Sequence, residues 1–216
     1  MEMSSGRCDY VKYWEEKGAQ KNFSTPFQID IFKEKVACNA DILDVGCGYG
    51  RIMSSLHEAG YENIKGVEPS ARLRSRGMDL DSSLDIRPLD GCTIPFQDNS
   101  FDAVLLVAVL TCIPKNKDQS CLIKEIHRIL KSGGILYVND FLLNTDQRNL
   151  DRYKLFQPKH DIYGIFELDG GGVLRHFSEE HINKLLSPFT SVEYKKVTYT
   201  TMNGNKSNGF YYIGSR

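Results

Sequence analysis

The feature that most constrains the fold is a glycine-rich turn at residues 46–50, with the sequence Gly-Cys-Gly-Tyr-Gly. It follows a predicted strand at residues 41–45 and precedes Ile52, Met53 and Leu56, whose spacing is that of a helix. Glycine lets the backbone turn sharply and lets a bound molecule approach free N–H groups closely. The turn therefore predicts a strand–turn–helix unit with a ligand at its tip, the alternative being a tight connection without a ligand.

The rest of the chain alternates short β-branched runs with helical patterns, which is typical of βαβ units and a mostly parallel sheet. We expect further strands at residues 63–68, 84–89, 103–107, 135–139, 192–197 and 210–213. We expect helices directly after the glycine turn, at residues 70–78 and 118–130, and after Ser178. The predicted fold is α/β, with a Rossmann-like, seven-stranded, mostly parallel sheet that carries helices on both faces.

Two carboxylates flank the glycine turn and indicate the ligand. Glu68 ends the next predicted strand, 20 residues after Gly48, where a carboxylate can accept both hydroxyl groups of a ribose. Asp44 lies two residues before the first glycine, where it would repel a pyrophosphate but suits an ammonium and a nearby sulfonium. A dinucleotide fingerprint needs glycine at its sixth position, which is Arg51 here. The chemistry favours S-adenosylmethionine over NAD, and an NAD(P)-dependent oxidoreductase is the alternative.

Composition excludes several classes of protein. The 216 residues are 41% hydrophobic and 25% charged, which is enough apolar content to bury a core. The 27 Lys and Arg against 28 Asp and Glu give a net charge of −1, without the basic excess of a nucleic-acid binder. The longest apolar run, residues 103–110, falls short of the roughly 20 residues that span a bilayer. With no secretory pattern at its start, the protein is expected to be cytoplasmic and to act without nucleic acid or membrane.

The six cysteines form no Cys-x-x-Cys pair and no array with zinc spacing, so no metal site is expected. In a cytoplasmic protein we expect them to be reduced, buried thiols.

Four segments between residues 41 and 140 resemble class I S-adenosylmethionine-dependent methyltransferases. Residues 42–51 resemble motif I of this family, and residues 66–70 resemble its ribose-binding segment. Residues 90–102 are similar to its adenine-side loop and the start of its fourth strand, and residues 128–134 to the turn into its fifth strand. The four segments occur in the family's order and spacing, and the resemblance is strongest to the small "type 11" branch.

The resemblance implies a set of contacts to S-adenosylmethionine. Asp44 would lie near the amino group of the methionine portion, and Glu68 would hold the ribose. Arg51, at the start of the first helix, is a candidate contact to the carboxylate of the methionine portion, the alternative being a solvated helix residue. Asp90 would accept a hydrogen bond from the adenine amino group. The other implied contacts are Tyr13, Gly46, Cys47, Gly48, Pro69, Gly91, Cys92 and, beneath the sulfur, Leu106.

In this family the acceptor lies over the carboxyl ends of the fourth and fifth strands, beneath an N-terminal lid. Residues 1–40 would form this lid, with a helix start at Thr25-Pro26. Tyr10 and Trp14 would cover the acceptor, unless these rings only pack the first helix onto the sheet.

An insertion at residues 141–177 is expected to select the acceptor, and its glycine-rich turn at residues 169–172 predicts a hairpin. Its candidates for binding the acceptor are Tyr153, Tyr163, Arg175 and His176. Arg175 would pair with a carboxylate or phosphate, the alternative being a surface ion pair. His176 would remove a proton from a hydroxyl group, the alternative being a structural histidine. The turn at residues 202–205 either only joins the last two strands or curls toward the acceptor.

We therefore expect one domain over residues 1–216, made of a lid (1–40), a cofactor-binding half (41–140), an insertion (141–177) and a C-terminal helix and strand pair (178–216). It would transfer a methyl group to an oxygen or nitrogen atom of a small molecule. Methyl transfer depends largely on alignment, and the sequence identifies no catalytic residue beyond the weak candidates His176 and Asp140. A non-catalytic protein that binds the cofactor is the second alternative.

Overall fold

The structure is a computed structural model that describes residues 9–216, with side chains from residue 11 onward. Its α-helices are α1 (Asp9–Glu16), α2 (Ile29–Lys33), α3 (Arg51–Glu58), α4 (Ala71–Leu80), α5 (Asn116–Ile129), α6 (Gln147–His160) and α7 (Glu179–Leu185). Two 3-10 turns are η1 (Gly18–Gln20) and η2 (Leu110–Cys112). The strands are β1 (Ile42–Val45), β2 (Ile64–Glu68), β3 (Asp85–Pro88), β4 (Phe101–Val107), β5 (Leu130–Phe141), β6 (Ile165–Glu167), β7 (Val173–Arg175), β8 (Thr190–Thr200) and β9 (Lys206–Ser215).

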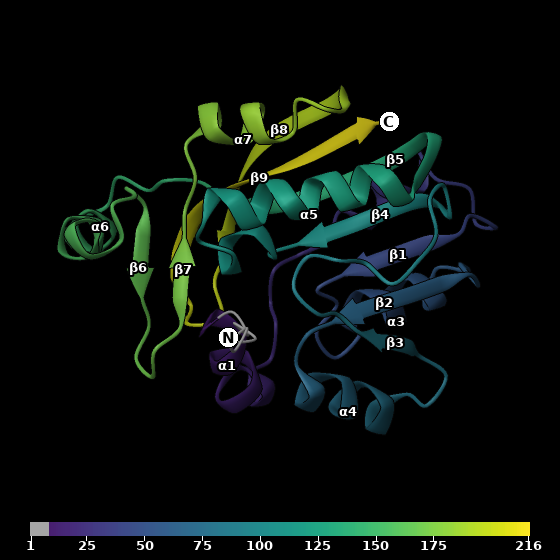
Figure 1. The fold of residues 1–216 in the computed structure, drawn as a ribbon, viewed down its shortest axis with the longest axis horizontal. Coiled ribbons are helices and arrows are strands. Elements are labelled where there is room, and N and C mark those ends of the chain that lie inside the picture. The colour runs from purple at the N-terminus through teal and green to yellow at the C-terminus, as the bar shows by residue number, and fades with distance from the viewer. Residues whose placement is uncertain (1–8) are drawn as a thin grey trace, which may run out of the picture.

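Seven strands form one sheet in the order β3-β2-β1-β4-β5-β9-β8 (Figure 1). Strands β1 to β5 pair in parallel, whereas β9 runs antiparallel to both β5 and β8. Pro88 ends β3, which is an edge strand of the sheet. Proline has no backbone N–H, and at such an edge position no hydrogen bond between strands is lost. The predicted Rossmann-like α/β fold is confirmed.

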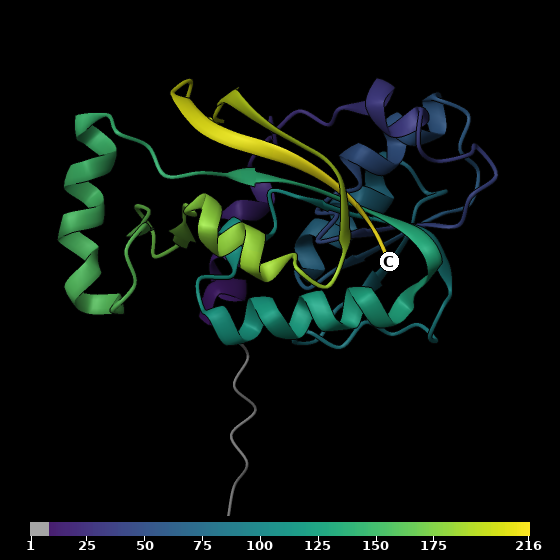
Figure 2. The same cartoon turned by 90° about the horizontal axis from the view of Figure 1, so that it is seen from above.

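Helices cover both faces of the sheet, as predicted. Helices α5 and α7 lie on one face, and α2 and α3 lie on the other (Figures 1 and 2). Side chains alternate across a strand. Val104 and Leu106 of β4 therefore pack in the hydrophobic core on the side of α5 and α7, and Ala103 and Leu105 pack in the core on the side of α2 and α3. All four are fully buried, which explains why this strand reads as a continuous apolar run.

The segment between η1 and α2 departs from prediction. Thr25-Pro26 starts no helix: residues 21–28 have no regular structure, and α2 begins only at Ile29. The carbonyl groups of Thr25 and Pro26 instead accept hydrogen bonds from the Arg51 guanidinium and the Asn139 side-chain amide. These carbonyls are therefore not available to start a helix, and the segment runs beside the glycine turn.

The insertion holds a helix that was not predicted and a hairpin that was. Helix α6 has a polar sequence, with Pro158 inside it, so its apolar periodicity is weak. The hairpin of β6 and β7 is confirmed around the glycine-rich turn. Both elements lie beyond the carboxyl ends of the parallel strands, together with α1 (Figure 1). Among the described residues, none of the helices is long and apolar enough to cross a membrane.

Candidate functional site

The glycine turn has the geometry of a ligand cradle. Gly46, Gly48 and Gly50 all have positive φ, at 70°, 60° and 80°. The Glu68 carboxylate accepts hydrogen bonds from the backbone N–H of Gly48 at 3.0 Å and of Ser70 at 2.8 Å. Glu68 therefore joins the turn after β1 to the end of β2, where ligands bind in sheets of this type.

A cavity of about 1100 Å³ extends from this turn to the insertion. It is large enough for a cofactor and a small second molecule, since a single-ligand pocket holds roughly 300–1,000 Å³. The predicted residues that line it are Trp14, Asp44, Gly46, Cys47, Arg51, Glu68, Pro69, Asp90, Gly91, Cys92 and His176. The structure thus brings together most of the predicted cofactor contacts, from three separate segments of the chain (44–51, 68–69 and 90–92).

Three predicted cofactor contacts lie outside the cavity wall. Leu106 is fully buried in the core, and the next residues, 107–109, line the cavity instead. Tyr13 packs against the backbone of Gly172, so it holds the hairpin while its neighbour Trp14 lines the cavity. Gly48 lies beneath the ring of Phe23, 2.4 Å from where a Cβ would stand. Gly48 is therefore needed to let Phe23 approach the turn.

Most predicted acceptor contacts in the insertion are also outside the wall. Tyr153 is buried behind His176, and Tyr163 is 42% exposed on the surface. Arg175 is buried and donates to the carbonyl of Pro114 at 3.0 Å, so it is neither a surface ion pair nor free for an acceptor. The side chain of Tyr10 lies outside the described part of the chain.

Asp140 does not have the position of a catalytic residue. Its fully buried carboxylate accepts hydrogen bonds from the backbone N–H groups of Thr111 at 3.1 Å and Phe141 at 2.8 Å. It therefore holds η2 against the end of β5 and lines no part of the cavity.

The turn at residues 201–205 lines the cavity, which is the second of the two roles considered for it. Other cavity residues were not among the predicted site residues: Lys21, Phe23, Ser24 and Thr25, and Arg148 and Arg152 of α6. The two arginines share one face of the helix because they are four residues apart. The signal for these two arginines was the i, i+4 spacing, which is visible only once residues 147–160 are known to be helical.

Burial controls the charge of the two carboxylates at the turn. Asp44 is 2% exposed, and burial raises its pKa to about 7, although the nearby Arg51 guanidinium opposes this shift. Burial likewise raises the pKa of Glu68 to about 7, against the two backbone N–H groups that hydrogen-bond it. The Oδ2 atom of Asp44 has no hydrogen-bond partner among the described residues. Asp44 is thus an unsatisfied acceptor at the edge of the cavity.

Comparison with known proteins decides the family. Residues 43–138 match the model of a methyltransferase domain. A solved S-adenosylmethionine-dependent methyltransferase from Methanosarcina mazei superposes with a TM-score of 0.81 at 27% identity, over 86% of this chain and 96% of that one. Residues 43–138 are a class I S-adenosylmethionine-dependent methyltransferase domain.

Curated relatives of this chain are longer and differ in the acceptor for which they are named. A phthiotriol/phenolphthiotriol dimycocerosates methyltransferase from Mycobacterium ulcerans is 32% identical over 66% of this chain and 47% of its own length. A sterol 4-C-methyltransferase from Caenorhabditis elegans is 31% identical over 56% of this chain and 38% of its own length. The chain therefore spans less than half of these two relatives. Other relatives are named for tRNA, so the relatives do not agree on one acceptor.

The residues present fit S-adenosylmethionine, the cofactor of the family. The unsatisfied Oδ2 of Asp44 suits an ammonium group, and the cradle at Gly46 has no room for a Cβ, which would stand 2.8 Å from Val109. Arg51 has an unsatisfied buried Nε beside Asp44 and suits a carboxylate. Glu68 retains a free lone pair on each oxygen for ribose hydroxyl groups.

Binding of S-adenosylhomocysteine to this protein should release protons near neutral pH. The ligand's ammonium group and ribose hydroxyls favour ionised Asp44 and Glu68, so binding lowers pKa values that stand at about 7 in the free protein. Affinity should therefore rise between pH 6 and pH 8. Calorimetry in two buffers of different ionisation enthalpy measures the release, which should shrink in Asp44→Asn. An affinity independent of pH in this range would contradict these assignments.

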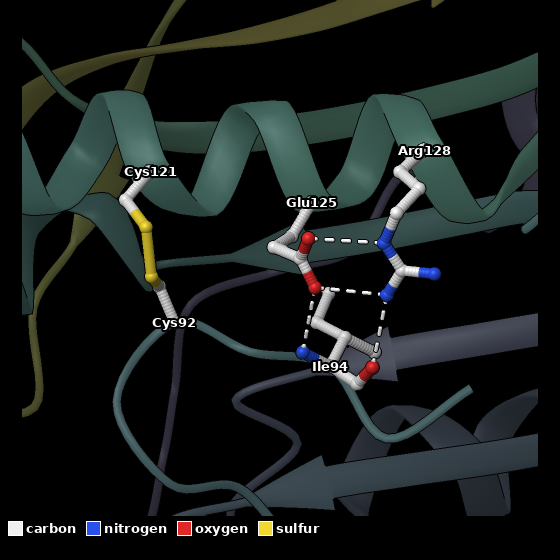
Figure 3. The surroundings of a disulfide bond; sticks show 5 residues. All are labelled: Cys92, Ile94, Cys121, Glu125 and Arg128. Atoms are coloured by element: carbon white, nitrogen blue, oxygen red, sulfur yellow. Dashed lines mark hydrogen bonds and ion pairs between the residues drawn. A yellow bond between two sulfur atoms is a disulfide. The ribbon is translucent and has the colours of Figure 1, made fainter. Parts of the chain in front are cut away.

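Three cysteines differ from the prediction of reduced, buried thiols, since two form a disulfide and one is exposed. Cys92 and Cys121 form a disulfide, which links the loop at residues 90–92 to helix α5 (Figure 3). Cys38 is free but exposed, whereas Cys47 is free and buried; Cys8 lies outside the described residues. The spacing of 29 residues gave no indication of the pair, because only the packing of α5 beside the loop brings the sulfur atoms together.

Next to the disulfide, two side chains of α5 hold the same loop. Glu125 accepts a hydrogen bond from the backbone N–H of Ile94 at 3.0 Å, and Arg128 donates to its carbonyl at 3.0 Å (Figure 3). Arg128 also pairs with Glu125 at 2.8 Å. Residue 94 is therefore fixed independently of the sulfur atoms, whereas residues 90–92 depend on the disulfide.

Reducing the disulfide should weaken cofactor binding without unfolding the protein. A freed loop must be ordered when the ligand binds, which costs conformational entropy. We expect several-fold weaker binding of S-adenosylhomocysteine by Cys121→Ser, with an unchanged far-UV spectrum, because Glu125 and Arg128 still hold Ile94. Cys38→Ser, at an exposed free thiol, is the matched control. Equal affinities of the wild-type protein and Cys121→Ser would show that the disulfide does not order the loop.

Proposed function

We propose that this chain transfers the methyl group of S-adenosylmethionine to an oxygen or nitrogen atom of a small molecule. The observation that carries the proposal is the extent of the cavity, which reaches from the glycine turn and Glu68 to residues of β5, the β6–β7 hairpin and the turn between β8 and β9; this end of the cavity is called the chamber below. A protein that only bound the cofactor would not need this chamber.

The chamber supports a small acceptor with an apolar body. Phe141, Phe166, Leu168, Leu174 and Met202 all line it, and they come from β5, the hairpin and the turn between β8 and β9. Residues 21–25 and Trp14 line the cavity from the N-terminal side. These segments would exclude water from the reacting atoms, and they leave little room for a large nucleic acid.

The reaction needs no protonation of the leaving group by the protein. S-adenosylmethionine supplies an electrophilic methyl carbon on a sulfonium, which leaves as a neutral thioether with the electron pair of the broken carbon–sulfur bond. The new bond forms to the acceptor's oxygen or nitrogen, whose proton passes to solvent. The residues around the cavity would contribute by aligning the acceptor with the methyl group and by keeping water out.

His176 is better suited to donate a hydrogen bond than to remove a proton. Its Nδ1 lies 2.6 Å from the hydroxyl oxygen of Tyr153, and burial lowers its pKa to about 3, with the nearby Arg152 and Arg148 adding to the shift. The Tyr153 hydroxyl accepts a hydrogen bond from the backbone N–H of Asn144, so its own proton points to Nδ1. The neutral ring then carries its proton on Nε2, which supports a donor role for His176 toward the acceptor.

Turnover with a defined panel tests the proposal. The protein is incubated with S-adenosylmethionine and, separately, with hydroxyl-bearing small molecules, amine-bearing small molecules, tRNA and no acceptor, and S-adenosylhomocysteine is measured by mass spectrometry. We expect product above the acceptor-free control with small molecules and none with tRNA. Methylation of tRNA alone would contradict the proposal. Binding of S-adenosylhomocysteine without turnover of any compound would favour a non-catalytic protein.

A further inference from the structure

We propose that the acceptor carries a carboxylate, held at the far end of the cavity by Arg152, Arg148 and His176. This inference rests on the proposed function, because it names the chemical class of the molecule that receives the methyl group. It concerns the end of the cavity formed by helix α6 and the β6–β7 hairpin, away from the glycine turn.

Arg152 carries a charge that the described protein does not neutralise. It lines the cavity but forms no ion pair with any carboxylate of the described residues. The Cζ atom of its guanidinium lies over the Phe166 ring, 3.4 Å from the centroid, and its buried Nε has no hydrogen-bond partner within the same residues. A cation over an aromatic ring is attracted to the ring face, and this contact uses none of the guanidinium N–H donors.

Other buried or half-buried arginines donate at least one hydrogen bond from their terminal nitrogens to the protein, although the Nε atoms of Arg51 and Arg175, like that of Arg152, have no partner among the described residues. Arg128 forms ion pairs with Glu125 and Asp98, both at 2.8 Å. Arg74 donates to the carbonyls of Glu68 and Pro69, and Arg175 donates to that of Pro114. A half-buried guanidinium without such partners is costly. Arg152 therefore has the features of a group whose partner arrives with a ligand.

Arg148 adds a second positive charge on the same face of α6. It stands four residues before Arg152, and its contact with Asp146 is long, 3.7 Å, between two side chains that are about half exposed. Such an exposed pair contributes little. Arg148 can therefore turn toward an anion in the cavity at small cost.

His176 supplies a hydrogen-bond donor between the arginines and the apolar wall. Its Nδ1 is occupied by the Tyr153 hydroxyl, and Asn144 lies 3.1 Å from the same nitrogen. Asn144 is fixed in turn by hydrogen bonds to the carbonyl of Leu142 and the hydroxyl of Ser207. This network orients the ring, so that Nε2–H is the donor left for the cavity.

Two guanidinium groups and one N–H donor match the planar geometry of a carboxylate. The walls beside them are apolar, with Phe141, Phe166 and Leu174 lining the cavity. The ligand that fits both features is an aromatic or aliphatic carboxylic acid. Its carboxylate would stand at α6 and its reactive oxygen or nitrogen nearer the glycine turn.

Matched aromatic probes test the inference directly. The protein, saturated with S-adenosylhomocysteine, is titrated by calorimetry with 2-naphthoate, 2-naphthamide and 2-naphthyl phosphate. We expect 2-naphthoate to bind at least about ten-fold more tightly than the uncharged 2-naphthamide, as a charge-assisted hydrogen bond predicts. Arg152→Met should remove this difference, and Arg148→Met should reduce it. Arg152→Lys, which keeps the charge but loses the planar fork, should retain part of it.

Arg87→Met is the control, because Arg87 lies on the exposed edge strand β3 and pairs with Asp85. Each variant is also titrated with S-adenosylhomocysteine, whose affinity should not change, which shows that the variant is folded and that Arg152 does not serve the cofactor. Equal binding of naphthoate and naphthamide, no binding of either, tighter binding of naphthyl phosphate, or an unchanged naphthoate affinity in Arg152→Met would each overturn the inference. A wild-type protein that fails to bind S-adenosylhomocysteine would instead count against the proposed function.

Discussion

Replacing Glu68 by alanine should weaken binding of S-adenosylhomocysteine by about 10- to 150-fold, or about 1.5–3 kcal/mol. Glu68 is 5% exposed and lines the cavity, so its truncation removes a nearly buried carboxylate acceptor for the ribose hydroxyls. The change also frees the backbone N–H groups of Gly48 and Ser70, which loosens the glycine turn. Calorimetry on the purified variant measures the affinity.

Glu68→Gln separates the charge of Glu68 from its shape. It retains one acceptor oxygen and should bind the ligand with an affinity between those of the wild-type protein and Glu68→Ala. Glu62→Ala, at an exposed position just before β2, is the control and should bind like the wild-type protein. A dissociation constant of Glu68→Ala equal to that of the wild type would remove Glu68 from the site.

Gly46→Ala should lower both the melting temperature and the affinity for S-adenosylhomocysteine. Gly46 has φ of 70°, a conformation that costs an alanine about 1–2 kcal/mol. The added Cβ would stand 2.8 Å from Cγ2 of Val109, which lines the cavity, so Val109 must move into the space for the cofactor. We expect more than about a ten-fold loss of affinity, since a well-packed site cannot absorb a shift of this size without loss of contacts.

Gly60→Ala separates backbone strain from steric closure of the site. Gly60 also has positive φ, 91°, but nothing lies within 4 Å of its Cβ position and it lies outside the cavity. It should lower the melting temperature and leave the affinity unchanged. If both variants bind the ligand equally well, the space at Gly46 is not part of the cofactor site.

The parts of the site that could be predicted are those formed by residues close together in the chain. The glycine turn at residues 46–50 and Glu68 belong to consecutive βα units, so their spacing alone places them at one edge of the sheet. The helix after Ser178 was likewise predicted from its cap, and the Ser178 hydroxyl does accept from the backbone N–H of His181.

What could not be predicted depends on contacts between distant segments. Thr25-Pro26 has a local preference for a helix start, but hydrogen bonds from Arg51 and Asn139 hold these residues in another conformation. The choice of Trp14 over Tyr13 as the cavity residue depends on the approach of Gly172, more than 150 residues away in the chain. Arg152 stands in the cavity because α6 packs beside the hairpin, and polar sequences such as that of α6 give little periodic signal.

A crystal structure of the protein with S-adenosylhomocysteine tests the central claim most directly. The account predicts ribose hydroxyl groups within hydrogen-bond distance of the Glu68 carboxylate, the amino group beside Asp44 and the adenine against residues 90–92. It also predicts an open chamber beyond the sulfur that ends at Arg152. A nucleoside bound anywhere other than between the glycine turn and residues 90–92, or a ribose without contact to Glu68, would contradict it.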